Sequence, residues 1–126
     1  MSYCSDTLPK LQAALERSWN KETCYPPLQE EWIKENPAFG QCAVTALIVQ
    51  DFFGGDILFC DHQNHAWNKL PDGTEIDLTR SQFPSDIMPC PDGIIDRQEF
   101  LYSEAALNAK TLVRYLDLKR KVISFF

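Results

Sequence analysis

Apolar side chains recur at helical spacing near both ends of the chain. Close to the start the interval is three or four residues, which predicts an amphipathic helix. Its apolar positions are Leu8, Leu11, Leu15 and Trp19. Near the end, "SEAALNAKTLVRYLDLKRKV" predicts one long helix over 103–122, with Ser103 or Asn108 as its N-cap. The expected inward stripe of that helix is Leu112, Tyr115, Leu116 and Val122.

The middle of the chain carries its most apolar segment, from Gln41 to Phe53. Part of this segment is β-branched, so a strand is possible. Its length and the following Gly54 and Gly55 favour a helix. We therefore expect a buried central helix that begins close to Cys42, with its apolar stripe at Val44, Leu47, Ile48 and Phe52.

Shorter segments predict strands. They are "DILFC" (56–60), "HAWNKL" (65–70) and "TEIDLT" (74–79), and the turn "PDG" joins the last two. Pro26 and Pro27 predict a loop before the central helix, and residues 80–100 read as an irregular surface excursion because prolines interrupt them. The pattern indicates a single α+β domain over 1–126, with helices around a small, mainly antiparallel sheet.

The turn "PDG" determines which side chains of the hairpin can meet. With three loop residues, Pro71 and Asp72 form a type I turn and Gly73 takes the left-handed position. A two-residue loop would shift the register by one and separate His65 from Asp77, but it suits the proline and the glycine less well. The longer loop puts His65, Trp67, Asp77 and Thr79 on one face and Ala66, Leu70, Ile76 and Leu78 on the other.

Composition narrows the classes of function. The chain has 44% hydrophobic and 24% charged residues, a net charge of −6 and no basic cluster beyond "DLKRK", so nucleic acid is not an expected partner. The longest apolar stretch, "CAVTALIV", is too short to cross a membrane. The start, "MSYCSDTLPK", lacks the features of a secretory signal. We expect a soluble, cytoplasmic protein with no membrane partner.

The five cysteines are an odd number at irregular spacing, which favours reduced thiols over a disulfide framework. No C-x-x-C pair is present. Cys42, Cys60, His62 and His65 together match no standard ligand spacing. We therefore expect no metal and no other cofactor.

Of the five cysteines, Cys42 has the position that best suits a reactive thiol. In the first turn of a helix its sulfur lies near free backbone N–H groups and the positive end of the helix dipole, which stabilise a thiolate. His65 could then transfer protons while Asp77 orients its ring, as in a Cys-His-Asp triad. Two plainer interpretations stay open. Cys42 can be a small core residue, and Asp77 can be a strand-end carboxylate bonded to Thr79 or Arg80.

Other residues have supporting roles in this hypothesis. The N–H of Cys42 and the side chains of Asn36 and Gln41 are candidate donors to an oxyanion, with Gln63 as a rival. Trp67 suits the core or the wall of the site, and its role in substrate binding is a weaker hypothesis. His62, the alternative to His65, falls on the opposite strand face and is expected at the surface.

The segments "SWNKETCYP", "NPAFGQCAVTALIVQDFFGG", "HAWNKLPDGTEIDLTRSQF" and "RYLDLKRKV" resemble the YunG-like family of small uncharacterised bacterial proteins. The order Cys, His, Asp also resembles the papain-like superfamily, especially its transglutaminase-like branch. This resemblance implies a papain-like fold with the triad at Cys42, His65 and Asp77. It places Asn36 where papain-like enzymes hold a glutamine of the oxyanion hole.

Two functions follow as hypotheses. The first is a cysteine-dependent hydrolase or acyltransferase that acts on an amide or thioester bond of a small-molecule or protein substrate. The alternative is a non-catalytic binding or regulatory module that keeps the papain-like scaffold. Reactivity of Cys42 distinguishes the two, because only an enzyme needs an activated thiolate.

Overall fold

The computed structural model describes residues 7–83 and 91–126. Within these ranges, four strands form one antiparallel sheet in the order β3-β2-β1-β4. The strands are β1 (Asp56–Cys60), β2 (His65–Lys69), β3 (Glu75–Ile76) and β4 (Gly93–Ile95). The α-helices are α1 (Thr7–Ser18), α2 (Cys42–Phe53), α3 (Arg97–Tyr102), α4 (Glu104–Asn108) and α5 (Thr111–Ile123). Two 3-10 helices, η1 (Pro26–Glu31) and η2 (Arg80–Gln82), complete the described elements.

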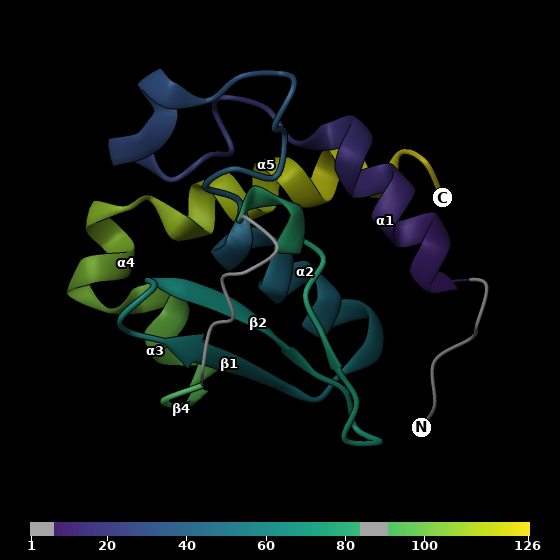
Figure 1. Cartoon of the computed structure of the whole chain (residues 1–126), viewed down its shortest axis with the longest axis vertical. Helices are drawn as coiled ribbons and strands as arrows, with labels where there is room; N and C mark the ends of the chain where they lie inside the picture. Colours follow the sequence, from purple (N-terminus) through teal and green to yellow (C-terminus); the bar gives the residue numbers. More distant parts are fainter. Residues whose placement is uncertain (1–6, 84–90) are drawn as a thin grey trace.

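Helix α2 lies between the sheet and α5, and α1 packs beside α5 (Figure 1). Residues 44–49 of α2 are all buried, as expected of a helix that is apolar on nearly every side. Asn68 of β2 donates from Nδ2 to the carbonyl oxygen of Ala46 at 3.0 Å, which ties the sheet to the helix. The central helix expected from the sequence is therefore confirmed, and its first residue is Cys42.

The hairpin register is also confirmed. Asn68 pairs with Ile76 and Lys69 with Glu75, and the N–H of Leu70 donates to the carbonyl oxygen of Thr74 at 2.7 Å. Gly73 has φ of +92°, the left-handed position that the three-residue loop requires. Regular pairing of β3 ends at Ile76, so this strand is shorter than the expected 74–79. The face that packs on the main core carries Ala66, Leu70, Ile76 and Leu78.

The expected single C-terminal helix is wrong. It is divided into α4 and α5, because Lys110 adopts a left-handed conformation (φ +56°) between them. Ser103 caps α4 by accepting the N–H of Ala106 at 3.2 Å, while Asn108 lies within α4 and caps nothing. Leu116, which was expected to face inward, is 52% exposed, and Leu118, which was not, lies fully buried in the core.

Two segments expected to be irregular contain short regular elements. The prolines at 26 and 27 begin η1, where a missing backbone N–H costs nothing. Within 80–100 the described residues form η2, β4 and the first turn of α3. Strand β4 forms because it pairs with the free edge of β1. Such pairing depends on residues distant in the sequence, so the local pattern of residues 93–95 does not predict it. Pro84 and Pro89 lie outside the described residues.

A charged cluster fastens the helices on the side of α2 away from Cys42. Asp51 of α2 accepts from Arg97 of α3 and Lys119 of α5, at 2.8 and 2.9 Å, and from the hydroxyl of Tyr115.

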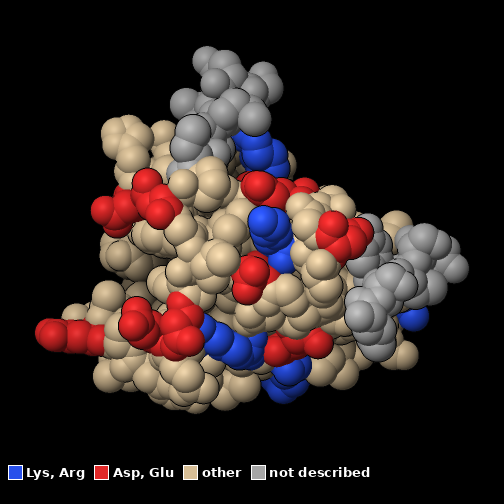
Figure 2. All heavy atoms as spheres, turned by 90° about the horizontal axis from the view of Figure 1, so that it is seen from below, with Lys and Arg blue, Asp and Glu red and all other residues tan. Residues whose placement is uncertain are grey.

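In the described ranges, no helix is long and apolar enough to span a membrane. Figure 2 shows acidic and basic side chains interspersed on one face of the molecule, without a continuous basic surface there.

Gly55 and Gly73 give a matched test of this packing. Both have positive φ, but a methyl group at Gly55 would lie 2.2 Å from the carbonyl oxygen of Lys69, while one at Gly73 meets no atom of the described residues within 4 Å. We predict that Gly73→Ala costs about 1–2 kcal/mol for its backbone conformation alone. Gly55→Ala costs at least about 1 kcal/mol more because β1 and β2 must separate. Urea unfolding measures both, and equal losses would contradict the close approach at Gly55.

Candidate active site

Cys42 begins α2 and is half-buried at the edge of a cavity. Its Sγ lies 4.0 Å from the carbonyl oxygen of Asn64, in the turn between β1 and β2. The side chain of the preceding residue, Gln41, makes no capping hydrogen bond to the helix. The N–H groups of the first turn are therefore left for another acceptor, which is the condition for anion binding at a helix start.

His65 and Asp77 meet as the hairpin register predicts. Nε2 of His65 lies 2.6 Å from Oδ2 of Asp77, and the imidazole is fully buried. The other carboxylate oxygen of Asp77 accepts from the N–H and the hydroxyl of Thr79 at 3.1 and 3.2 Å. Both interpretations of Asp77 thus describe the same carboxylate: its bonds to Thr79 fix the orientation in which it faces the ring.

Two aromatic rings hold the imidazole from other directions. Trp67 stacks on His65 with ring centroids 5.5 Å apart and an interplanar angle of 18°. Phe83 meets the ring edge-on, at 4.7 Å and 87°. The indole N–H of Trp67 donates to Oε1 of Glu75 at 2.9 Å, which fixes the tryptophan in turn. The ring of His65 therefore has little freedom to rotate.

The second nitrogen of His65, Nδ1, is buried and makes no hydrogen bond to any residue that the structure describes. Burial of the ring opposes its charged form, but the hydrogen bond to Asp77 and the neighbouring Cys42 thiol outweigh that effect and raise the pKa of His65 from 6.5 to about 9. The imidazole thus favours its protonated state at neutral pH. With Nε2 occupied by Asp77, Nδ1 is the nitrogen left for the neighbouring thiol, and His65 itself is not among the residues that line the cavity.

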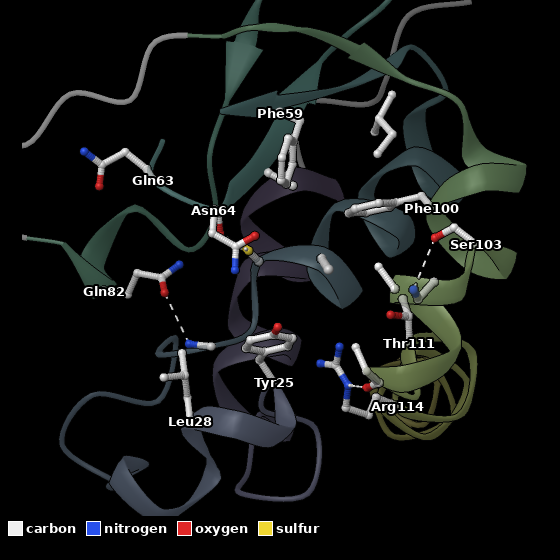
Figure 3. A pocket seen from close by; sticks show the side chains of 18 of the residues that line it. Tyr25, Leu28, Phe59, Gln63, Asn64, Gln82, Phe100, Ser103, Thr111 and Arg114 are labelled. Atoms are coloured by element: carbon white, nitrogen blue, oxygen red, sulfur yellow. Dashed lines mark hydrogen bonds between the residues drawn. The ribbon is translucent and has the colours of Figure 1, made fainter. Parts of the chain in front are cut away.

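The cavity beside Cys42 has a volume of about 470 Å³, which is within the range of small-molecule sites. Its walls are mainly apolar and come from widely separated segments (Figure 3). Phe59 of β1, Phe100 of α3 and Tyr25 beside η1 contribute aromatic surface, and Arg114 of α5 contributes a charge. A small molecule in this space would contact Cys42 at one point of the wall.

The other residues singled out in the sequence take varied places. Asn36 is half-buried but does not line the cavity. Gln41 is fully buried and donates from Nε2 to the carbonyl oxygen of Asn20 at 2.9 Å. Gln63 lines the cavity, whereas Trp67 does not and packs on His65 instead. His62 is exposed, as expected.

Sequence reasoning missed several residues of the site, among them Asn64, Phe83 and Arg114. Asn64 carries a sign in the sequence, since asparagine tolerates its positive φ of +48° in a turn. Phe83 and Arg114 carry none, because only the tertiary fold brings them to Cys42. Among the residues that the structure describes, no group of three or more His, Cys, Asp or Glu side chains is placed to hold a metal ion.

Comparison with known proteins adds the family. A family model described as YunG protein matches residues 7–126. The chain belongs to the YunG family. It is 37% identical over 75 residues to "Uncharacterized protein YunG" of Bacillus subtilis (strain 168), a match that covers 58% of this chain and 60% of that relative. No solved structure matches the chain.

The contact with Asp77 predicts a measurable pKa in this YunG-family protein. In an NMR titration of the imidazole signals, we expect the pKa of His65 to be about 9 in the wild type and clearly lower in Asp77→Asn. Glu75→Gln is the matched control, because it removes a carboxylate from the same hairpin without touching His65. An unchanged pKa in Asp77→Asn would show that the pair does not hold the proton.

The free energy of unfolding should depend on the protonation of His65. Because folding raises the pKa of His65 from 6.5 to about 9, its contribution is complete below pH 6.5 and is lost as pH rises through 9. The free energy of unfolding of the wild type should therefore exceed that of Asp77→Asn most near about pH 6 and least above about pH 9. Chemical denaturation across this range measures the difference, and a gap that widens with pH would contradict it.

Proposed function

We propose that this protein is a papain-like cysteine hydrolase or acyltransferase that acts on an amide or thioester bond. The observation that carries the proposal is the buried His65, which bonds Asp77 through Nε2 and lies near Cys42 with Nδ1 unpaired among residues 7–83 and 91–126. A cysteine at the start of a central helix, with the histidine on β2 and the aspartate directly after the adjoining strand β3, resembles the arrangement of papain-like enzymes. The adjoining cavity gives the substrate a place to bind.

The chemistry begins with the thiolate of Cys42 and the imidazolium of His65. The sulfur attacks the acyl carbon, a C–S bond forms, and the carbonyl electrons move to the oxygen. We assign the N–H of Cys42 as a donor to that oxyanion, since Gln41 is engaged with Asn20 and Asn36 lies away from the cavity. When the oxyanion collapses, the bond to the leaving amine or thiol breaks and the leaving group takes the proton of His65.

The acyl-thioenzyme is released by the reverse sequence. His65, now neutral, takes a proton from a water molecule or an amine as that group attacks the thioester carbon. The C–S bond then breaks and the thiolate of Cys42 leaves, which restores the initial ion pair. Asp77 stabilises the imidazolium throughout and fixes the ring, and it does not itself need to be protonated. Hydrolysis, deamidation and transfer share this first half and differ in the second nucleophile.

Alkylation separates this proposal from a non-catalytic scaffold. At neutral pH, iodoacetamide should label Cys42 ahead of the other four cysteines, at least about tenfold faster than the buried Cys24 and Cys60. Burial raises the pKa of Cys24 to about 11, so this thiol is a protected internal reference. Peptide mapping by mass spectrometry after timed quenching gives the individual rates.

The same labelling experiment tests the role of His65. His65→Gln should slow the labelling of Cys42 by roughly tenfold, because the imidazolium no longer stabilises the thiolate. His62→Gln, which removes the exposed second histidine, should leave the rate unchanged. If Cys42 reacts no faster than the buried cysteines, or if His65→Gln has no effect, the protein is better described as a binding module.

A further inference from the structure

Arg114 stands out because it is a buried cation in the wall of the cavity. Its side chain extends from α5, is 5% exposed and lines the same space as Cys42. Nε donates to the carbonyl oxygen of Ala109 and Nη1 to that of Thr23, both at 2.9 Å. Both acceptors are neutral, so these bonds hold the guanidinium in place without balancing its charge.

No carboxylate in the described parts of the chain lies within ion-pair distance of Arg114. Glu99 also lines the cavity, but its exposed side chain makes no ion pair with the arginine. Burial lowers the pKa of Arg114, and the titratable groups that oppose this effect are the thiols of Cys42 and Cys24 and the hydroxyl of Tyr25. A buried guanidinium stays charged, and leaving it without a counter-ion is costly.

The surroundings suit an anionic ligand with an apolar portion. In Figure 3, Arg114 and Tyr25 lie on one side of the cavity, with Phe59 across from them. The planar fork of a guanidinium matches a carboxylate or a phosphate, and a water-poor, apolar site strengthens that bond. Because the protein carries a net charge of −6, this buried cation is a local exception that favours an anion inside the cavity.

We propose that the substrate is a small acyl compound bearing a carboxylate or phosphate, which Arg114 binds while the acyl carbon faces Cys42. This inference rests on the function proposed above and adds the class of substrate. An alternative role for Arg114 is purely structural, since it links α5 to the loop after α1 through Thr23. The test must therefore measure discrimination between ligands, which a structural link alone does not produce.

Matched thiol-reactive probes provide that measurement. N-Chloroacetyl derivatives of glycine, β-alanine and γ-aminobutyrate carry a carboxylate at increasing distance from the reactive carbon, and their carboxamides are neutral counterparts. For at least one length, the carboxylate should label Cys42 roughly tenfold faster than its amide, as expected for hydrogen bonds to a charged group. N-Chloroacetyl-ethanolamine phosphate, set against N-chloroacetyl-ethanolamine, gives the matching rate ratio for phosphate, and the larger of the two ratios identifies the preferred anion.

The preference should depend on Arg114. In Arg114→Gln, the ratio of the two labelling rates should fall to about one, since the variant loses the charge. Arg120→Gln is the matched control, because it removes a charge from the exposed surface of the same helix. The ratio is the deciding quantity, since the charge of Arg114 also acts on Cys42 and its loss changes both rates together. A ratio near one for every probe in the wild type would overturn the proposal.

A binding measurement separates this inference from the catalytic proposal. The ligand for calorimetry is the N-acetyl analogue of the carboxylate probe that labels best, which lacks the reactive chlorine. Cys42→Ala should bind this ligand but not its carboxamide. The double variant Cys42→Ala with Arg114→Gln should bind neither. Binding of the anion by a protein whose Cys42 is unreactive would leave the anion site standing without the enzyme. A reactive Cys42 with equal binding of anion and amide would reject the anion site and keep the enzyme.

Discussion

The hydrogen bond between His65 and Asp77 depends on a single choice of register in the β2–β3 hairpin. Side chains alternate along a strand, so a shift of one residue would move Asp77 to the opposite face. The turn at Pro71, Asp72 and Gly73 prevents that shift, because its proline and glycine occupy the positions whose backbone angles suit them. A turn that does not itself line the cavity thus determines the electrostatics of the imidazole.

The second constraint is the burial of α2. Because residues 44–49 are enclosed between the sheet and the other helices, the start of this helix is fixed relative to β2. The Asp51 cluster fastens the other side of α2 to α3 and α5. Cys42 and Arg114 then lie on one cavity although 72 positions separate them in the sequence. Packing of α2 and the ion pairs of Asp51 thereby bring the proposed nucleophile and the proposed anion-binding residue to the same cavity.

Much of this arrangement is encoded locally. The alternation of β2, the turn and the glycine stop after Phe53 were sufficient to predict the central helix, the hairpin and the meeting of His65 with Asp77. The break at Lys110 was not predictable, because lysine has no preference for the left-handed conformation it adopts there. Strand β4 depends on the free edge of β1, which a local pattern does not reveal.

Arg114 shows the same limit at the site. Its neighbours in the sequence read as an amphipathic helix in which a cation belongs on the solvated face, yet the tertiary fold buries it against Thr23. Charged side chains are expected at the surface, since most of them lie there in folded proteins. A charged residue that is buried instead, as Arg114 is, therefore calls for a functional explanation.

The most direct test of the account is to trap the acyl-thioenzyme. The protein is mixed with a small thioester bearing a terminal carboxylate, quenched in acid at successive times and examined by intact-mass and peptide analysis. The account predicts an acyl adduct on Cys42 that forms and then decays as water or an added amine attacks it, and that is absent from Cys42→Ser. Acylation that is equally frequent on other cysteines, or no adduct on Cys42 at any time, would contradict it.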